Sequence, residues 1–575
     1  MFRKKWFALF LVLCACSLPG SSAEAVSLSQ ETAGDLRFLL KEPSPLLAWG
    51  WDGLHHGEIL TSFYAERDYR PAWVGDLGLG RKGAELLSVL RDAGREGLCP
   101  EDYHLGEIEP LATLEADSRR YGVLFDSSYV ARLDLLLTDA FLLYAHHLRH
   151  GRVDPCALHL GLCALTEGGD VTRLLKQVLD GEGVAGALDS LLPHHESYDR
   201  LRQALETLRR LSALGGWPAV PAGPTLRPGD VDRRVDLLRE RLEISGDYSG
   251  AGDEPGGGGE FNAGLEDALK RFQRRHGLVA DGVVGPKTLA ELNTPVEARI
   301  RQVELNLERW RWLPRDLGRR HLQVNIADFS LEVVEGGRAV MSMPVIVGTG
   351  YRKTPIFSAR MKYLVFSPYW NVPPTILRED KLPRIKDDPG YLERKNFEIV
   401  RGRGEGKEIL DLSGISWDQV TADRFPGVLR QRPGPWNPLG QVKFLFPNSF
   451  DVYLHDTNDK HLFGHHVRSF SSGCIRVERP QDLAAFVLEE EEDWDCDRIL
   501  DATEFESPLW VRLSNPLPVH ILYRTAWVDA AGAMQFRRDI YQRDVDLELA
   551  LGNKGKPGEA EQGYVIQDRP ALSGD

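Results

Sequence analysis

The stretch that decides how this chain is interpreted is YLHDTNDKHLFGHHVRSFSSGCIRVER, residues 453–479. An aromatic and aliphatic strand ends at His455, a polar loop follows, and a Ser-Ser-Gly turn presents Cys474 before the next apolar segment. A thiol and an imidazole are the two groups that nucleophilic acyl transfer requires, because the imidazole can take the thiol proton and later return it. The spacing lets the two side chains meet across adjacent strands, so we predict an acyl-transfer site here.

The residues next to Cys474 suit the same chemistry. Gly473 permits a tight turn that would aim the backbone N–H groups of Gly473 and Cys474 at one point, where they could stabilise an oxyanion. Arg476 falls on the same face of the strand as Cys474 by the period of two, and could hold a substrate carboxylate with two hydrogen bonds. A non-catalytic alternative stays open, in which Cys474 is structural or disulfide-bonded, with Cys496 as its partner.

Short runs of alternating or β-branched residues surround this stretch and predict a β domain. They lie at residues 322–326, 330–334, 341–348, 361–366, 442–446 and 451–455. Asp and Gly turns separate them, so a mainly antiparallel sheet is expected. A segment rich in Pro, Arg, Asp and Glu interrupts the strands at residues 367–440. So long an insertion within one sheet is usually functional, commonly a lid, and a surface decoration is the alternative.

Two short helical patterns precede the β domain. Residues 265–292 carry an apolar stripe at helical spacing, then a glycine stop and a Gly-Pro helix start. This pattern resembles the small three-helix peptidoglycan-binding domain, which we place at residues 225–295 with a flexible Gly-rich insertion at 245–260. A compact helical spacer without glycan contacts is the alternative, because a fold does not by itself guarantee binding.

The first part of the chain is helical by its apolar spacing. We predict a scaffold-like domain over residues 26–220, made of several short helices because Pro and Gly clusters interrupt the pattern. His146 and His150 fall on one helical face, as a pair of metal ligands would. A helix that ends before Gly151 favours positive side chains in any case, so we expect no metal site. A connector helix over 296–318 should join the peptidoglycan-binding domain to the β domain.

The N-terminus has the order of a secretory signal peptide: positive residues at 3–5, an apolar run to about residue 16 and small residues at 23–25. The apolar run is too short to span a bilayer comfortably. We therefore expect residues 1–25 to be a signal peptide cleaved near Ala25, with lipid attachment at Cys16 as the alternative. No later segment is apolar and long enough to be transmembrane.

The cysteine count fits export with one reactive thiol. Seven cysteines, less Cys14 and Cys16 of the signal peptide, leave five. An odd number in an oxidising compartment leaves at least one thiol free, and Cys474 is our candidate. The spacing leaves the pairing open among Cys99, Cys156, Cys163 and Cys496, although Cys156 and Cys163 are close enough in sequence to pair.

Three motifs together resemble the L,D-transpeptidase family, whose members join stem peptides in bacterial peptidoglycan. They are His455 followed by Ser-Ser-Gly-Cys-Ile-Arg-Val at 471–477, Gly-x-x-Lys-Phe-x-Phe-Pro-Asn at 440–448, and Val-Gly-x-Gly at 347–350 with Thr-Pro at 354–355. With the peptidoglycan-binding domain and the lid-like insertion, the chain is similar to the large periplasmic members of Gram-negative bacteria. Many members carry His where this chain has Ser472. The Ser form is similar to the large subgroup and leaves His455 as the one base we expect.

The resemblance implies a reaction. The Cys474 thiolate attacks the carbonyl between residues three and four of a tetrapeptide stem, and D-alanine leaves, protonated by His455. The diaminopimelate amine of a second stem then resolves the thioester into a cross-link between the third residues of the two stems. No metal or organic cofactor is implied. The expected supporting residues are Gly473, Ser472 and Asp456 around the oxyanion and the base, and Arg476, Tyr453, Trp370 and Asn448 for the substrate.

Two other functions use the same features. An L,D-carboxypeptidase or thiol peptidase would employ the same cysteine and histidine with water as the acceptor, and a non-catalytic peptidoglycan-binding scaffold would need neither. The resemblance also implies the partners: peptidoglycan stem peptides and glycan, cell-wall synthases, and β-lactams of the carbapenem type as inhibitors. Nucleic acid is not expected, because a net charge of −15 is poorly suited to binding phosphates.

We therefore expect a multidomain α+β protein that acts in the periplasm. It should have a helical N-terminal region, a small three-helix peptidoglycan-binding domain, and a mainly antiparallel β catalytic domain with an inserted lid subdomain. The catalytic domain should span 319–545 with its lid at 367–440, and a disordered tail should follow at 546–575.

Overall fold

The computed structural model describes residues 27–41, 54, 56–122, 125–158, 171–249, 259–402 and 407–552. They form two compact units: unit 1 falls within Met1–Arg91, Pro100–Tyr144 and Thr172–Ala187, and unit 2 within Asp92–Cys99, Ala145–Val171 and Leu188–Asp575. The expected signal peptide, Cys163 and residues 250–258 of the Gly-rich insertion lie outside the described residues. Among the residues described, no helix is long and apolar enough to cross a membrane.

Unit 1 is helical, as predicted for the N-terminal region, and contains one short strand pair. The buried carboxylate of Asp134 holds its centre together, because it accepts hydrogen bonds from the backbone N–H groups of residues 72–74 at 2.7–3.0 Å and from the Tyr64 hydroxyl at 2.6 Å. The elements are α1 (Leu28–Lys41), α3 (Gly57–Glu66), β1 (Val74–Gly75), β2 (Gly78–Leu79), α4 (Arg81–Arg91), η2 (Pro100–Tyr103), α5 (Leu105–Arg120), α6 (Ser127–His150, in this unit to Tyr144), α7 (Val171–Asp180) and α8 (Val184–Asp189).

Unit 2 opens with helices that lead to the sheet. They are η1 (Ala93–Glu96), η3 (Pro155–Leu158), α9 (Glu196–Ala213), α10 (Arg234–Ile244), α11 (Ala263–Arg275), α12 (Pro286–Leu292) and α13 (Val296–Arg311). Helices α10 to α12 share a small apolar core that includes Leu238, Leu269 and Phe272. Trp312, directly after α13, packs into the core of the sheet, so the aromatic end of this helix is buried in the next domain.

The main sheet has nine strands in the order β13-β5-β14-β12-β11-β6-β15-β3-β4, and β4 pairs with β5 as well, so it closes on itself. Most pairs are antiparallel; β12–β14, β13–β5 and β15–β3 are parallel. The predicted mainly antiparallel β domain is confirmed. The strands are β3 (Arg320–Asn325), β4 (Ser330–Glu335), β5 (Arg338–Gly348), β6 (Phe357–Phe366), β11 (Val442–Leu445), β12 (Leu454–His455), β13 (Ser469–Ser471), β14 (Ile475–Val477) and β15 (Leu509–Leu522).

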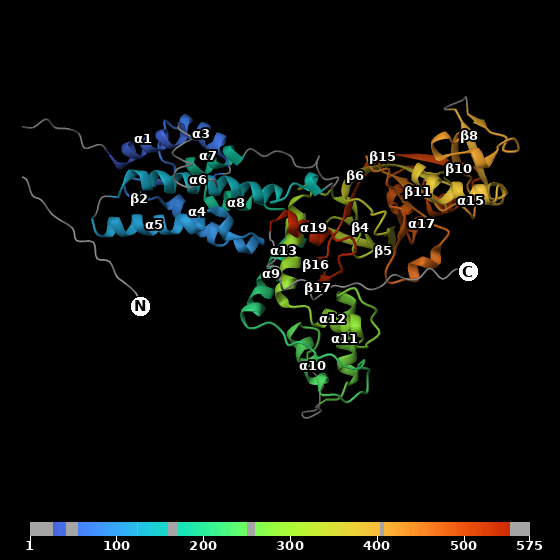
Figure 1. Cartoon of the computed structure of the whole chain (residues 1–575), viewed down its shortest axis with the longest axis horizontal. Helices are drawn as coiled ribbons and strands as arrows, with labels where there is room; N and C mark the ends of the chain where they lie inside the picture. The colour runs from blue at the N-terminus through green and yellow to red at the C-terminus, as the bar shows by residue number, and fades with distance from the viewer. Residues whose placement is uncertain are drawn as a thin grey trace, which may run out of the picture. The chain divides into compact units, whose positions relative to one another are not determined.

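The segment between β6 and β11 folds as a subdomain, with a four-stranded sheet in the order β7-β10-β8-β9. It has its own apolar core, which includes Ile385, Ile399 and Leu429. In Figure 1, β8, β10 and α15 lie together beside β11. Its elements are β7 (Trp370–Asn371), α14 (Pro374–Ile376), η5 (Leu377–Lys381), α15 (Leu382–Asp387), α16 (Tyr391–Arg394), β8 (Phe397–Arg401), β9 (Glu408–Ile409), η7 (Trp417–Gln419), η8 (Ala422–Arg424) and β10 (Val428–Gln431).

The C-terminal elements correct one expected boundary. Residues 546–552 are not part of a tail, because α19 runs to Ala550 and the side chain of Leu547 is fully buried in the core of the sheet. Residues 553–575 lie outside the described residues. The remaining elements are η9 (Lys460–Gly464), α17 (Pro480–Leu488), α18 (Cys496–Thr503), β16 (Ala526–Val528), β17 (Met534–Phe536) and α19 (Arg543–Ala550).

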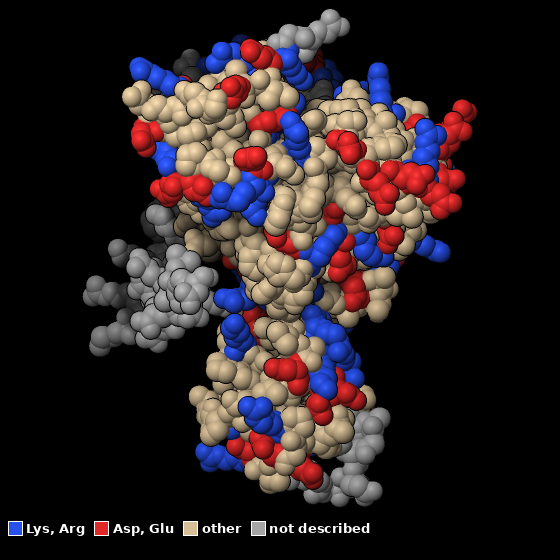
Figure 2. All heavy atoms as spheres, turned by 90° about the vertical axis from the view of Figure 1, so that its right-hand side faces the viewer, with Lys and Arg blue, Asp and Glu red and all other residues tan. Residues whose placement is uncertain are grey.

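Charges of both signs are scattered over the face of the molecule drawn in Figure 2. Lys and Arg side chains are interspersed there with Asp and Glu, and a group of acidic side chains lies at the upper right. This face therefore presents no continuous basic surface of the kind that follows a phosphate backbone.

Candidate active site

Two short neighbouring strands bring the predicted residues to one face. Strands β12 and β14 run parallel, with His455 paired to Arg476 and Leu454 to Ile475. Leu454 and Ile475 are fully buried in the core of the sheet. Because side chains alternate along a strand, His455 and Arg476 point the other way, together with the flanking Tyr453 and Cys474. All four of these line one cavity.

His455 is placed to act as a base. Its Nδ1 lies 2.5 Å from the backbone carbonyl oxygen of Asp456, which can only accept, so Nδ1 carries the proton and Nε2 has the free lone pair. Burial, and then the charge of Arg476, lower the pKa of His455 to about 3. The imidazole is therefore neutral throughout the physiological pH range.

Cys474 carries a free thiol that is partly exposed to the cavity. Burial raises the pKa of the thiol above its ordinary value, while the Tyr453 backbone N–H and the Lys443 ammonium act in the opposite direction. The sulfur lies 3.9 Å from the Asp451 carbonyl oxygen. Within the part of the chain that the structure describes, no hydrogen bond joins this thiol to His455, so the resting pair is a thiol and an imidazole on one face.

The turn before Cys474 is held by its own side chains. Gly473 has φ +118°, a conformation that favours glycine. Its N–H donates to the Ser471 hydroxyl at 3.1 Å, and its carbonyl accepts from the Thr354 hydroxyl at 2.8 Å. The Ser471 hydroxyl in turn donates to the Cys474 carbonyl at 2.5 Å. The Gly473 N–H, which we expected to face an oxyanion, is therefore engaged within the turn in this conformation.

Ser472 links the turn to the inserted subdomain through an arginine. Its hydroxyl accepts from Arg352 Nη1 at 2.9 Å. The same guanidinium binds Asp380 at 3.2 Å and also forms an ion pair with Glu379, both in η5. These carboxylates raise the pKa of Arg352, the Glu379 hydrogen bond most, so its charge is permanent.

Two predicted residues have other contacts. The buried side chain of Asp456 binds the Lys460 ammonium at 2.5 Å and the Gln441 N–H at 2.8 Å, so its backbone carbonyl, not its carboxylate, orients His455. The Asn448 amide nitrogen donates at 2.7 Å to the carbonyls of Phe446 and Val452. Asn448 thus holds the turn between β11 and β12, and the structure does not bring it to the lining of the cavity.

The cavity has a volume of about 530 Å³ and lies between the sheet and the inserted subdomain. Trp370 lines it, although the ring is 7% exposed and also belongs to the subdomain core. The Arg476 guanidinium donates from Nη1 to Oδ2 of Asp459 at 3.0 Å. The charged lining residues are Lys381, Arg384, Lys395 and Arg476 against Asp380 and Asp459, so the wall is predominantly positive.

Sequence reasoning counted Lys443 only as part of a family motif and gave it no role in the site. It is directly opposite His455 in the β11–β12 pair, and its Nζ lies 3.7 Å from the centre of the Tyr453 ring. Burial lowers the pKa of Lys443, while the Cys474 thiolate raises it, so the charges of the two groups interact electrostatically. The alternation of Val442 and Phe444 with Lys443 was the available signal, because directly opposite residues of an antiparallel pair share a face.

Three family models match separate parts of the chain. Residues 319–501 match a model described as "L,D-transpeptidase catalytic domain", residues 232–292 one described as "Putative peptidoglycan binding domain", and residues 58–205 one described as "Scaffold domain". The match over 319–501 contains the whole of the face built by β12 and β14.

A sequence relative points the same way. A Haemophilus influenzae protein named "Putative L,D-transpeptidase" is 33% identical over 258 residues, which make up 45% of this chain and 51% of the relative. The chain thus spans about half the length of that relative. A crystal structure of an L,D-transpeptidase from Xylanimonas cellulosilytica is 16% identical, with a TM-score of 0.16, and the match covers 52% of this chain and 99% of that one.

Proposed function

We propose that the protein cross-links peptidoglycan, with Cys474 as nucleophile and His455 as general base. The premise is that residues 319–501 carry a catalytic domain of the L,D-transpeptidase family. One observation carries the proposal. A free thiol and a neutral imidazole with an available Nε2 lie on one face, in a cavity of about 530 Å³. Acyl transfer requires these two groups and a site from which water can be excluded.

The reaction proceeds in two steps. The Cys474 sulfur attacks the carbonyl between residues three and four of a tetrapeptide stem, while Nε2 of His455 takes the thiol proton. The C–N bond breaks, D-alanine leaves with that proton, and a thioester remains. An amine of a second stem, the diaminopimelate side chain, then attacks the thioester, passes a proton to His455 and releases the thiol. The product is a cross-link between the third residues of two stems.

The charge of the cavity supports an anionic peptide donor. Stem peptides carry several carboxylates, and the wall offers Arg476 together with Lys381, Arg384 and Lys395. An arginine fork suits a carboxylate because it can donate two parallel hydrogen bonds. The peptidoglycan-binding match at 232–292 supports the same substrate and a place of action outside the cytoplasm, as the expected signal peptide does.

The inserted subdomain favours an amine over water as the acceptor. It supplies Trp370, Pro373 and Ile376 to the wall of the cavity that Cys474 also lines. Excluding water protects a reactive acyl intermediate from hydrolysis. We therefore place transpeptidation ahead of L,D-carboxypeptidase activity, which the same pair would perform with water.

The test is incubation of the protein with a disaccharide-tetrapeptide, with mass spectrometry of D-alanine release and of dimer. We expect both products from the parent protein, a loss of roughly a thousandfold or more for Cys474→Ala, and roughly a hundredfold for His455→Gln. Cys496→Ala is the matched control, because this thiol is also free but exposed on α18. A carbapenem should add its mass to Cys474 alone.

Each alternative gives a different result. D-Alanine release with tripeptide but no dimer would mean a carboxypeptidase. Neither product, with retained binding to peptidoglycan, would mean a non-catalytic scaffold. Dimer formation by Cys474→Ala would refute the nucleophile.

A further inference from the structure

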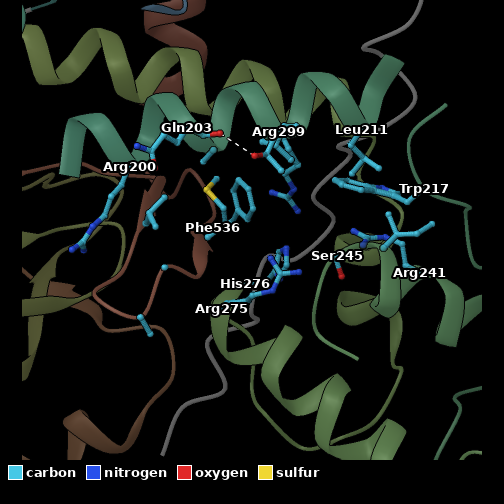
Figure 3. Close-up of a pocket in the computed structure, with 18 of the residues that line it drawn as sticks. Arg200, Gln203, Leu211, Trp217, Arg241, Ser245, Arg275, His276, Arg299 and Phe536 are labelled. Carbon is cyan, nitrogen blue, oxygen red and sulfur yellow. Dashed lines mark hydrogen bonds between the residues drawn. The ribbon is translucent and has the colours of Figure 1, made fainter. Parts of the chain in front are cut away.

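A second cavity, of about 590 Å³, lies in unit 2 away from Cys474. Helices α9, α10, α11 and α13 and the β16–β17 hairpin all contribute to it. Its lining includes four arginines and no Asp or Glu among the described residues. Figure 3 shows Arg299 above, and Arg275 and His276 below, the same open space, with Trp217 beside Arg241.

Three of the four arginines have acidic partners outside the lining. Arg275 binds the carboxylate of Asp247, with its Nε 2.6 Å from Oδ1. Arg299 forms an ion pair with Glu291, and Arg200 with Glu196. Their charges are therefore largely compensated within the protein. His276 adds none, because burial between aromatic rings lowers its pKa well below the ordinary value.

Arg241 is the exception. It is 1% exposed, and its Nε donates to the Leu292 carbonyl at 2.8 Å. Its guanidinium lies 3.9 Å from the centre of the Trp217 ring. Its Nη1 is buried without a hydrogen-bond partner among the described residues, and no ion pair to Arg241 is found there. Leaving a buried charge uncompensated is costly, so the side chain is suited to receive an anion.

The walls around Arg241 indicate what else the anion carries. Leu211, Ile244, Met534 and Phe536 line the cavity and offer apolar surface. The volume falls within the range of sites that hold small organic ligands. A ligand that combines carboxylates with short aliphatic groups, such as an alanine-ended peptide, therefore fits better than inorganic phosphate. Arg241, Arg275 and His276 also fall inside the region that matches a peptidoglycan-binding model.

We propose that this cavity is a second peptide-binding site, in which Arg241 holds a carboxylate of a peptidoglycan stem while Trp217, Met534 and Phe536 contact its aliphatic part. The inference rests on the proposed function for its choice of ligand. The site would hold one stem of the wall on the protein while the catalytic cavity acts on others.

Photo-crosslinking tests the site directly. The probe is a disaccharide-tetrapeptide with a diazirine on the diaminopimelate side-chain amine, applied to the full chain as Cys474→Ala so that it is not consumed. We expect adducts at residues 528–536, with half-saturation raised about tenfold or more by Arg241→Met. Arg210→Met is the control, because it makes the same change on the exposed face of α9. A fully amidated tetrapeptide should compete at least about tenfold more weakly than the free acid.

The outcomes separate this site from the catalytic one. Adducts at 453–476 without adducts at 528–536 would overturn the second site and leave the proposed function standing. Adducts at 528–536 with no D-alanine release by the Cys474 protein would support the second site and overturn the proposed function. Undiminished labelling of Arg241→Met, or equal competition by inorganic phosphate, would also overturn the assignment.

Arg241→Met removes a buried, uncompensated charge but also the hydrogen bond to the Leu292 carbonyl, so the melting temperature of the variant is measured beside that of its parent. If it melts lower than its parent, the comparison of free-acid and amidated competitors on the parent protein decides the question alone.

Discussion

Burial sets the charge state of the Cys474 and His455 pair. The pKa of the thiol is raised and that of the imidazole is lowered to about 3, so both groups are neutral near pH 7. The site therefore does not rest as a preformed thiolate and imidazolium. Proton transfer from sulfur to Nε2 must accompany attack on the substrate, which makes His455 a general base in the strict sense.

Lys443 is the residue-scale prediction. Its ammonium lies beneath the Tyr453 ring and stabilises the Cys474 thiolate. Replacing it by methionine keeps the length of the side chain and removes the charge, so the thiolate becomes less accessible. We expect alkylation of Cys474 by iodoacetamide at pH 8 to slow by roughly threefold to tenfold. Intact-mass measurement over time gives the rate.

Lys362→Met is the control for that experiment, because this lysine is exposed on the neighbouring strand β6. An unchanged alkylation rate in Lys443→Met, or an equal slowing in Lys362→Met, would show that the charge of Lys443 does not act on the thiol.

For single residues, the alternation of side chains along a strand predicts positions in the site better than reasoning about loop residues does. Tyr453 and His455, like Cys474 and Arg476, share a face because strand side chains alternate with a period of two. The contacts of Asp456 and Asn448 follow no such rule. Which of the two groups of Asp456 faces His455 depends on Lys460 and Gln441, and sequence spacing does not encode those hydrogen bonds.

At the scale of elements, the inserted subdomain is joined to the catalytic turn by Arg352. One guanidinium contacts Ser472, Glu379 and Asp380, and its side chain is 23% exposed. An isolated surface ion pair contributes little to stability, but one guanidinium that is ordered once and contacts three groups fixes their mutual positions. Arg352 therefore couples the position of η5 to that of the nucleophile turn.

Breaking this link should loosen the cover of the site. For Arg352→Met we expect faster amide hydrogen exchange at residues 377–381, and a severalfold higher ratio of hydrolysed tripeptide to cross-linked dimer, because water reaches the thioester. Hydrogen-exchange and product mass spectrometry measure the two effects. Arg378→Met is the control, since its ion pair with Asp423 is exposed and lies within the subdomain. Unchanged exchange and product ratio in Arg352→Met would rule out the coupling.

The strands and helices themselves were largely predictable from the sequence. The closure of the main sheet was not. Alternating runs marked most strands of the sheet because each has one buried face. The pairing of β4 with β5 that closes the sheet, and the three parallel pairs, depend on contacts distant in sequence. The expected start of the tail at 546 was wrong for the same reason. Leu547 lies in the alternating run Val-Asp-Leu-Glu-Leu at 545–549, and the sequence alone does not show that the sheet core buries it.

At the scale of the whole molecule, buried histidines link stability to pH. Burial is the first cause that lowers the pKa of each: to about 3 for His455, to about 4 for His195 and His520, and also downward for His276 and His321. The hydrogen bonds that their ring nitrogens make suit the neutral imidazole. In His520, Nε2 lies 2.9 Å from the Leu317 carbonyl and Nδ1 lies 2.8 Å from the Ser358 hydroxyl.

These shifts fix the sign of the pH dependence. In the unfolded chain a histidine binds a proton near pH 6.5, whereas folded His455, His195 and His520 stay neutral until about pH 3 or 4. Between those values the unfolded state holds more protons, so the free energy of unfolding falls as pH drops from about 6.5 and is unaffected by these groups above pH 7. Carboxylates add to the loss mainly at lower pH, closer to their own pKa values.

His520→Gln isolates one of these contributions. Glutamine can donate to the Leu317 carbonyl but does not titrate, so the melting temperature should fall less steeply from pH 7 to pH 5 than in the parent. The difference in unfolding free energy at pH 5 should reach up to about 2 kcal/mol. Thermal melts at constant ionic strength give the slopes, and His461→Gln, at an exposed position in η9, should keep the parental one. If His520→Gln also keeps it, His520 takes up its proton as readily in the folded protein as in the unfolded chain, and acid sensitivity must come from other groups.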